Sequence, residues 1–444
     1  MRKIKENQGI TLIALIVTIV VLLILASISI LMLIGQNGIL TQTQEAVKQS
    51  KEFGAVEKAK LAVTASKTAE GMDYNKLKDE LNSTIGIKEK IKEITSKDFP
   101  ARIIIDNTTL NIFLNGDVEI DKSAEPAYAM IYDNGYKLSD GTTESYEIII
   151  QRGDNIDEEK KLVKKCENIE AEGGTSWIEF RDNIEKVEIR NLIKPTNLKG
   201  SFGALKNCTT IQGLSKIDTS NCKSINAMFY GDTNLKNFDI NDLNVSTITD
   251  YCWAFSKMNS ITSLVLENWE VSNGEDFNGM ISECRNLENI KLGKWNTQKG
   301  KSFFAMFSDC TNLKEIDGLE NWDTSNFTDI GNMFYNCISL TNINVSNWNT
   351  SNVIAGYKVF YNCSSLQNLN ISNWNTTNMS NLSNIFGEMN NLKQISLGDK
   401  FSFKGNGNTW ATLPKGIWKS SSTGIEYSFN TIPNSKADTY TKVE

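Results

Sequence analysis

One short sequence pattern recurs at a nearly fixed spacing through the second half of the chain. Aligned on the residue that follows a Met slot, its copies lie at Leu205, Phe229, Phe255, Ile281, Phe307, Phe334, Phe360 and Phe386. A period of this length, roughly 26 residues, is typical of a solenoid, in which each repeat forms one coil. Because a single coil cannot bury its own apolar groups, each coil must pack against its neighbours.

The clearest copy runs from Trp322 to Val345 and predicts how one coil is built. A Leu-x-x-Ile-x-Val stretch at 340–345 has the alternation of a short strand. The Trp-Asp-Thr-Ser-Asn run at 322–326 predicts a turn, because Asp, Ser and Asn side chains bond to nearby backbone. The Met-Phe-x-x-Cys run at 333–337 then supplies three more apolar side chains on the far side of the coil.

The tryptophan slot of the repeat has two possible roles, core packing and stacking on sugar rings. The tryptophans in this slot are Trp269, Trp295, Trp322, Trp348 and Trp374. Earlier copies carry Leu243 and Ile217 at the same position. A slot that exchanges Trp with aliphatic residues favours packing in the core over ligand binding.

The cysteine slot also has two interpretations. The cysteines that share it are Cys208, Cys284, Cys310, Cys337 and Cys363. Met258 and Met389 replace them in other copies and Asp232 does so once, which favours a small buried side chain. The alternative is a ladder of disulfides, since adjacent coils stack at roughly 5 Å, a separation that disulfides permit. No CxxC pair is present, so neither interpretation makes these thiols catalytic or metal-binding.

The motif Trp-Asp-Thr-Ser-Asn, then Met-Phe, then Cys-x-x-Leu at 322–340 resembles the BspA-like family of surface repeat proteins. The resemblance covers roughly residues 217–397. It implies a leucine-rich-repeat type of solenoid exposed at a cell surface.

Composition narrows the possible functions. The chain has 53 acidic and 46 basic residues, which argues against a nucleic-acid partner. It contains no histidine, which excludes Ser-His-Asp and Cys-His catalysis and histidine-ligated metals. Asp323 is replaced by Asn296, Asn349 and Asn375 in other copies, so no facing pair of acids recurs for glycoside hydrolysis. We therefore expect no catalytic residue, no metal site and no cofactor.

A long uncharged segment lies near the amino terminus. Residues 1–9 are short and basic, and the stretch from residue 10 to residue 34 carries no charge. At about 1.5 Å per residue this segment crosses a bilayer, and it is longer than the roughly 7–15 residues of a secretory signal core. Positive residues before the span keep that end in the cytoplasm. The sequence therefore predicts a single-pass membrane protein with most of the chain outside the cell.

The run Gln-Gly-Ile-Thr-Leu-Ile-Ala-Leu-Ile-Val at 8–17 resembles the signal of type IV prepilins and of type II secretion pseudopilins. The resemblance implies that a prepilin peptidase cuts after Gly9 and that Ile10 becomes N-methylated. The family's acid at the fifth mature position, which implies a contact with a neighbouring pilin-like subunit, is Ala14 here. That departure points to a minor or tip subunit. A cleaved secretory signal and a permanent anchor remain open beside the prepilin interpretation.

We expect an α+β chain in which a long transmembrane and pilin-like helix with a small antiparallel sheet precedes the solenoid. Strand-like segments at 102–105, 109–114 and 117–120 form the small sheet, with a hairpin at Asn115-Gly116. The expected segments are a basic leader (1–9), a transmembrane and pilin-like helix (10–66), a small pilin-like head (67–122), a transition region and amino-terminal cap (123–204), the repeats (205–397) and a carboxyl-terminal cap (398–444).

These features together predict a non-enzymatic cell-surface protein that uses the repeats for adhesion or recognition. The expected partners are the membrane, prepilin peptidase, other pilin-like subunits, and an extracellular protein or glycan. The tail carries no Leu-Pro-x-Thr-Gly sorting signal, so we expect attachment through the amino terminus. The alternative is a surface repeat protein anchored by an uncleaved transmembrane helix, without assembly into a filament.

Overall fold

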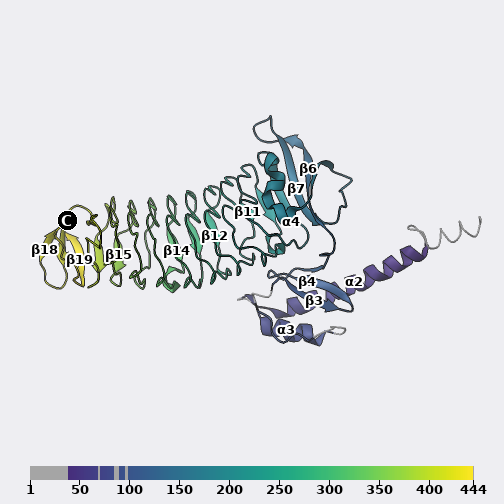
Figure 1. Cartoon of the computed structure of the whole chain (residues 1–444), viewed down its shortest axis with the longest axis horizontal. Helices are drawn as coiled ribbons and strands as arrows, with labels where there is room; N and C mark the ends of the chain where they lie inside the picture. Colours follow the sequence, from purple (N-terminus) through teal and green to yellow (C-terminus); the bar gives the residue numbers. More distant parts are fainter. Residues whose placement is uncertain (1–38, 69–70, 85–89, 96–98, 444) are drawn as a thin grey trace, which may run out of the picture. The chain divides into compact units, whose positions relative to one another are not determined.

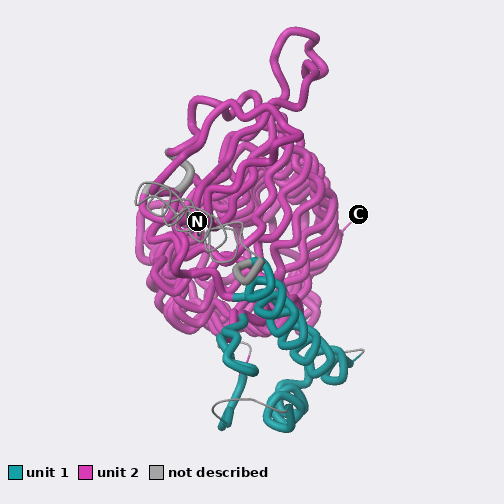
Figure 2. The backbone as a smooth tube through the Cα atoms, turned by 90° about the vertical axis from the view of Figure 1, so that its right-hand side faces the viewer, with its two compact units in different colours: residues 1–94, 102–110, 118–120 teal, residues 95–101, 111–117, 121–444 magenta. Residues whose placement is uncertain are grey.

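The computed structural model describes residues 39–68, 71–84, 90–95 and 99–443. The predicted leader and span, with Gly9, Ile10 and Ala14, lie outside these residues. The chain divides into two compact units, coloured in Figure 2. Unit 1 comprises residues 1–94, 102–110 and 118–120, and unit 2 comprises residues 95–101, 111–117 and 121–444.

Unit 1 is built on a long helix, α2 (Ile39–Ser66). A two-stranded antiparallel pair, β1 (Lys67–Thr68) and β2 (Gly71–Met72), leads from it to α3 (Tyr74–Ser83). Asp73 caps α3, because its carboxylate accepts a hydrogen bond from the Lys76 amide at 3.0 Å. Among the described residues, no helix is long and apolar enough to cross a membrane.

The packing of α2 against α3 follows from small residues on one helix face. The buried residues of α2 include Ala55, Ala59, Ala62 and Val63, which recur at intervals of three and four. Leu77 and Leu81, one turn apart on α3, are also fully buried. The small side chains let the two helices approach closely. Although α2 is mostly polar, one of its faces is therefore buried against α3.

Three short strands follow where the sequence predicts them. They are β3 (Ala101–Ile105), β4 (Thr108–Ile112) and β5 (Val118–Ile120), in the sheet order β3-β4-β5. The predicted turn at Asn115-Gly116 is present, with the Gly116 amide bonded to the Phe113 carbonyl at 2.8 Å. Gly116 has a φ of 89°, a conformation that glycine adopts without a steric cost.

The main segment of unit 2, residues 121–444, begins with a six-stranded sheet that runs directly into the first coils (Figure 1). Its strands, in sheet order, are β11 (Asn237–Phe238), β10 (Thr210–Gln212), β9 (Ile184–Ile189), β7 (Glu144–Arg152), β6 (Ala127–Lys137) and β8 (Lys161–Cys166). The pairs β6–β7 and β6–β8 are antiparallel, whereas β7–β9, β9–β10 and β10–β11 are parallel. The short helices α4 (Ile169–Glu172) and η2 (Gly173–Phe180) place Ile169 and Trp177 in the core. The first coil therefore extends an existing sheet, which covers the core at this end of the array.

The solenoid has about eight turns of leucine-rich-repeat type. Parallel strands at equivalent positions of successive coils line one side: β12 (Ser263–Val265), β13 (Asn289–Lys291) and β14 (Glu315–Asp317), then β15 (Asn368–Ile371) and β16 (Gln394–Leu397). Short 3-10 turns, η3 (Leu214–Lys216) and η4 (Leu319–Asn321), follow two of the strand segments. Residues 341–345 occupy the same position without regular strand pairing.

On the opposite side of the coil, one pattern of backbone hydrogen bonds recurs and joins each coil to the next. Alternate amides donate to the next coil, as Asn332 and Asn336 do to the Tyr357 and Tyr361 carbonyls, each at 2.9 Å. The intervening Tyr335 amide donates three residues back, to the Asn332 carbonyl at 3.0 Å. This alternation places two residues of the coil in the left-handed region, here Asn332 (φ 55°) and Asn336 (φ 57°). Asn tolerates that conformation better than most residues and also occupies it at Asn362 and Asn384, whereas other coils place Ala, Lys, Glu, Asp or Trp there.

A five-stranded sheet closes the far end. The last parallel strand, β16, pairs antiparallel with β19 (Asp438–Val443), which in turn pairs with β17 (Ile417–Ser420), and β17 pairs with β18 (Glu426–Ser428). Trp418 and Tyr440 of this sheet are fully buried. One continuous apolar core runs from Ala127 to Tyr440, through the cap, the coils and this closing sheet.

Candidate functional site

The tryptophan slot lies inside the solenoid. All of its indoles are at most 4 % exposed, and successive rings stack nearly parallel at centroid distances of 5.9 to 6.4 Å. The Trp348 Nε1 donates to the Leu319 carbonyl of the preceding coil at 3.1 Å, and Trp374 does the same to Val345. The ring faces and most of the indole N–H groups are therefore used between coils. No face of these indoles is available to a sugar.

The repeat cysteines are also internal. All eight cysteines of the chain lie among the described residues and are buried as thiols rather than joined in disulfides. In several coils the thiol donates to a carbonyl of the preceding coil at 3.0 to 3.1 Å: Cys284, Cys310, Cys337 and Cys363. Burial raises the pKa of the Cys337 and Cys363 thiols well above the ordinary value. A protonated, buried thiol is a packing group and a poor nucleophile.

The turn residues act on the backbone as the sequence predicts. The Asp323 carboxylate accepts the Ser325 amide at 3.0 Å, and Asn349 accepts the Ser351 amide at 3.1 Å. The asparagines before the Trp slot (Asn268, Asn321, Asn347 and Asn373) belong to the same turns; Asn373, for example, donates to the Ser346 carbonyl at 2.8 Å. Such bonds satisfy backbone groups of the turn itself and of the adjacent coil.

Sequence reasoning missed a threonine that follows the Asp/Asn position in several coils. The Thr350 hydroxyl donates to the Asn375 carbonyl at 2.9 Å, and its oxygen accepts the Asn375 amide at 2.8 Å. The Thr324 hydroxyl bonds Asn349 in the same two ways, at 3.1 and 2.7 Å. Both side chains are buried. Each therefore ties its coil to the next one at a point where no regular strand pairing exists.

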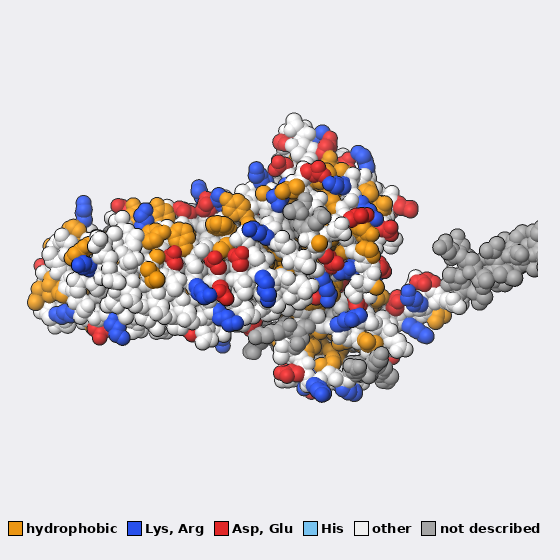
Figure 3. Space-filling model, in the orientation of Figure 1, with side chains coloured by type: hydrophobic (Ala, Val, Ile, Leu, Met, Phe, Trp, Pro, Cys, Tyr) orange, Lys and Arg blue, Asp and Glu red, His pale blue; other side chains and the backbone are white. Residues whose placement is uncertain are grey.

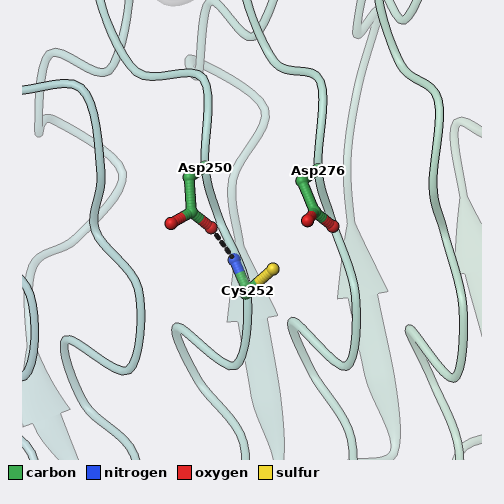
Figure 4. Close-up of side chains that lie close together, drawn as sticks. All are labelled: Asp250, Cys252 and Asp276. Atoms are coloured by element: carbon green, nitrogen blue, oxygen red, sulfur yellow. Dashed lines mark hydrogen bonds between the residues drawn. The ribbon is translucent and has the colours of Figure 1, made fainter.

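One cluster has the composition of a metal site. Asp250, Cys252 and Asp276 have ligand-type atoms within 4.8 Å of one another (Figure 4). Asp250 Oδ1, however, accepts the Cys252 amide at 3.0 Å, and Asp276 Oδ1 accepts the Asn278 amide at 3.1 Å. Asp329 makes the same bond to the Gly331 amide two coils further on. The carboxylates thus belong to a repeated turn, as the backbone bridges between their coils also indicate.

Exposed aromatic side chains on the array form a second candidate, which we call the aromatic row. The aromatic row consists of Trp253, Phe304, Tyr335, Tyr357 and Tyr361. Trp253 is 49 % exposed, and the others are partly exposed. Figure 3 shows hydrophobic side chains gathered along one long edge of the array.

Glycines of adjacent coils hold three of these rings in place. A Cβ on Gly387 would lie 2.6 Å from the Tyr361 ring, and one on Gly331 would lie 2.8 Å from the Tyr357 ring. Gly279 stands in the same relation to Trp253, at 2.4 Å. Each ring thus rests directly on backbone, in space that any other residue would fill.

A cation lies within the aromatic row. The Tyr335 and Tyr361 rings stack with centroids 5.2 Å apart and planes 12° apart. The Lys358 ammonium lies 5.5 Å from both centroids, a cation–π distance. Among the described residues no ion pair of Lys358 is found. Next to the rings, Asn362 donates to Asn336 at 3.0 Å, which donates in turn to Asp309 at 2.8 Å.

This arrangement is suited to binding rather than to bond breaking. It offers rings of fixed orientation beside a cation and a line of amides, and tyrosine and tryptophan are enriched where proteins recognise ligands. The row occupies the variable positions between the fixed slots. The sequence places ligand binding at such positions but cannot name them, because a single sequence does not reveal which variable residues share a face.

Comparisons with known proteins describe the same part of the chain. A family model described as "Mycoplasma protein of unknown function, DUF285" matches residues 196–317 and again 301–404. No protein of curated function matches the chain. A leucine-rich-repeat protein of T. pallidum is 16 % identical, with 48 % of this chain and 89 % of that chain covered and a TM-score of 0.28. A leucine-rich-repeat protein of Leptospira interrogans is 14 % identical, with 52 % and 69 % covered and a TM-score of 0.19. The family description names no activity, so any functional conclusion depends on the residues themselves.

Proposed function

We propose that this chain is a non-enzymatic cell-surface protein whose repeats serve adhesion to, or recognition of, an extracellular protein or glycan. We propose further that it is a minor or tip subunit of a pilus-like or secretion pseudopilus assembly. The observation that carries the recognition function is the aromatic row, in which the Lys358 ammonium is equidistant from the stacked Tyr335 and Tyr361 rings.

The construction of the array supports this function. Backbone bonds join successive coils on both sides of the solenoid, and buried threonine hydroxyls join them at the turns. A surface on such a frame is already ordered before it meets a ligand. Binding then costs less ordering entropy, which favours tight and specific contacts.

The carboxylates of the array support recognition over catalysis. Asp250, Asp276 and Asp329 accept turn amides, and Asp232 is fully buried. The chain has no histidine to act as a general base near neutral pH. General acid–base catalysis by a pair of these carboxylates is disfavoured, because the acids that recur accept hydrogen bonds from turn amides.

The assembly function rests on the amino-terminal sequence and on α2. The prepilin-like run at 8–17 precedes a helix that the sequence predicts to continue into α2. On α2, the large apolar side chains of Val47, Phe53 and Leu61 are exposed. In a pilus-like assembly such side chains contact neighbouring pilin-like subunits. Ala14 in place of the family's acid, and the large array itself, favour a tip position over the filament body.

Mass spectrometry of the native protein tests the assembly function. We expect cleavage after Gly9 and a methyl group on Ile10, and loss of both when the prepilin peptidase is removed. An intact Met1 in the membrane fraction would support the alternative, a surface protein anchored by an uncleaved helix. A different amino terminus on a released protein would contradict both.

Cell adhesion tests the recognition function. Cells that carry the triple change Tyr335→Ala, Lys358→Ala and Tyr361→Ala should lose attachment to host-matrix proteins or glycans while their surface level of the protein is unchanged. The matched control is Ile354→Ala, which removes an exposed apolar side chain outside the aromatic row. Equal attachment by the triple variant and the control would refute a binding function of the row.

A further inference from the structure

A cavity of about 290 Å³ lies in the carboxyl-terminal cap, between two loops that follow the last coil. One wall comes from residues 403–412 and the other from residues 429–434. Side chains that line it include Phe403, Trp410, Thr412, Phe429, Asn430 and Asn434. Its volume is near the lower end of the roughly 300–1,000 Å³ found for small-molecule sites, which suits a ligand of the size of one sugar.

The first wall is fixed on the last coil. A Cβ on Gly407 would lie 1.7 Å from the Ser380 carbonyl oxygen, and one on Gly405 would lie 2.4 Å from the Met379 carbonyl oxygen. The Asn406 amide between them donates to the Met379 carbonyl at 2.8 Å. The loop therefore lies directly on the backbone of the array, in contact that only glycine permits.

The second wall is tied to the first. The Asn434 side-chain oxygen accepts the Phe403 amide at 2.7 Å. The Leu413 amide donates to the Phe429 carbonyl at 3.3 Å, and the Ala411 amide donates to the Phe403 carbonyl at 2.7 Å. Because these bonds hold each loop and join the two, the cavity exists before any ligand arrives.

The lining combines one flat apolar surface with uncharged polar groups. Trp410 is 58 % exposed, although most tryptophans of the chain are buried. The Lys404 ammonium lies 5.7 Å from the Trp410 ring centroid, a contact that restrains the indole. Since the oxygen of Asn434 already accepts the Phe403 amide, its NH₂ group remains to donate. Asn430 and Thr412 add exposed amide and hydroxyl groups.

A pyranose ring has the complementary chemistry. Its C–H face is apolar and flat enough to stack on an indole, and its hydroxyls both donate and accept hydrogen bonds. The side chains that line the cavity are uncharged, and the Lys404 ammonium beside it is engaged on the Trp410 ring, which favours a neutral ligand over an acidic one. A purely apolar ligand would displace water from the two amides and the hydroxyl without replacing its hydrogen bonds, which is unfavourable.

From this geometry we propose that the cap cavity binds one pyranose residue of a neutral glycan. Trp410 stacks on the sugar, and Asn430, Asn434 and Thr412 bond to its hydroxyls. The proposal deepens the recognition function and rests on it for its biological setting, because it names the class of ligand that the surface protein would meet.

The test is a titration of the full-length protein in detergent micelles with methyl glycosides of glucose, galactose, mannose and N-acetylglucosamine. Binding is followed by saturation-transfer NMR and by tryptophan fluorescence. We expect at least one glycoside to bind with a Kd on the order of 1 mM, as is usual for a ligand of this size. Trp410→Ala should weaken that binding by roughly tenfold or more.

The chain offers a matched control for the indole. Tyr136 is an aromatic side chain that is also about half exposed and lies outside both the cavity and the aromatic row, so Tyr136→Ala should leave sugar binding unchanged. Asn434→Asp keeps the oxygen that accepts the Phe403 amide and removes the NH₂ donor, so it should weaken binding without loosening the loops. If Trp410→Ala fails to fold, as judged by circular dichroism, the exposed Asn430→Ala replaces it.

Three results would overturn the proposal. None of the four glycosides binds, or Trp410→Ala binds as well as the parent, or N-acetylneuraminic acid binds more tightly than every neutral sugar. These outcomes are separable from a failure of the recognition function, because the triple change that tests it on cells lies in the aromatic row and leaves the cavity lining unchanged. They are also separable from a failure of the assembly function. Sugar binding in micelles does not depend on cleavage at Gly9, and a methylated Ile10 can coexist with an empty cavity.

Discussion

Asp232 provides the sharpest stability prediction, because it is a carboxyl group in the core. It occupies the cysteine slot of its coil and is fully buried. Its Oδ1 accepts the Leu205 amide at 2.8 Å, while among the described residues no partner is found for its Oδ2. Burial raises the pKa of Asp232 well above its ordinary value, against a smaller lowering by the Leu205 amide and the Arg181 guanidinium. A neighbouring ionisable group, the Cys208 thiol, has a pKa raised to about 12 and is neutral.

The sign of the pH dependence follows from these pKa values. An unfolded Asp ionises near pH 3.9, so above about pH 4 the folded chain keeps a proton that the unfolded chain has released. The free energy of unfolding therefore decreases as pH rises, by up to about 1.4 kcal/mol per pH unit, until the folded carboxyl itself ionises. Asp232→Asn keeps the acceptor for the Leu205 amide and cannot ionise, so the variant should lack this slope.

Thermal unfolding of parent and variant between pH 4.5 and 8 measures the effect. We expect the difference in Tm, variant minus parent, to increase with pH by a few degrees per unit. Asp239→Asn, an exposed carboxylate, is the control for a change of net charge and should run parallel to the parent. Parallel curves for Asp232→Asn and the parent would refute the reasoning, because they would mean that the buried carboxyl is ionised in the folded state.

Three further changes test the packing between coils. Trp348→Ala should cost about 3–5 kcal/mol, measured by urea unfolding, because the indole is fully buried between stacked neighbours; a cost below about 1 kcal/mol would place the ring outside the core. Thr350→Val should cost about 1–3 kcal/mol, since it removes the hydroxyl that both donates and accepts, whereas Thr350→Ser should cost much less. Cys363 should resist iodoacetamide in the folded protein and react after denaturation, because burial raises its pKa; a thiol that stays unreactive in denaturant without reductant would instead favour the disulfide ladder.

The sequence predicted the array because its information is periodic. A fixed period with Trp, Met-Phe and Cys slots predicts which side chains are buried. The side chains of Trp322, Phe334 and Cys337 are buried as this pattern predicts. The pattern also predicted the turn bond of Asp323, since that bond is local. Hydrogen bonds within a turn and the spacing of apolar residues can both be predicted from one amino-acid sequence.

What the sequence could not supply are the contacts between coils. The Thr350 hydroxyl bonds a residue of the following coil, and nothing in the spacing distinguishes it from an exposed threonine. Gly331 and Gly387 resemble ordinary loop glycines until the rings of neighbouring coils are seen to rest on them. The cap cavity depends on two loops separated by β17 and β18, neither of which carries a repeated motif. The prepilin-like processing at Gly9 and Ile10 stays a prediction of the sequence.

Each kind of side-chain hydrogen bond between coils keeps one direction along the array, which affects how the number of repeats can change in evolution. The buried turn threonines Thr324 and Thr350 engage the following coil, and the indole N–H groups of Trp348 and Trp374 engage the preceding one, so these coils present the same two faces as their neighbours. A whole repeat can therefore be duplicated or deleted in register, with both end sheets left as they are. Slippage between repeated stretches of the gene would then lengthen or shorten the array by whole repeats while the fold is preserved.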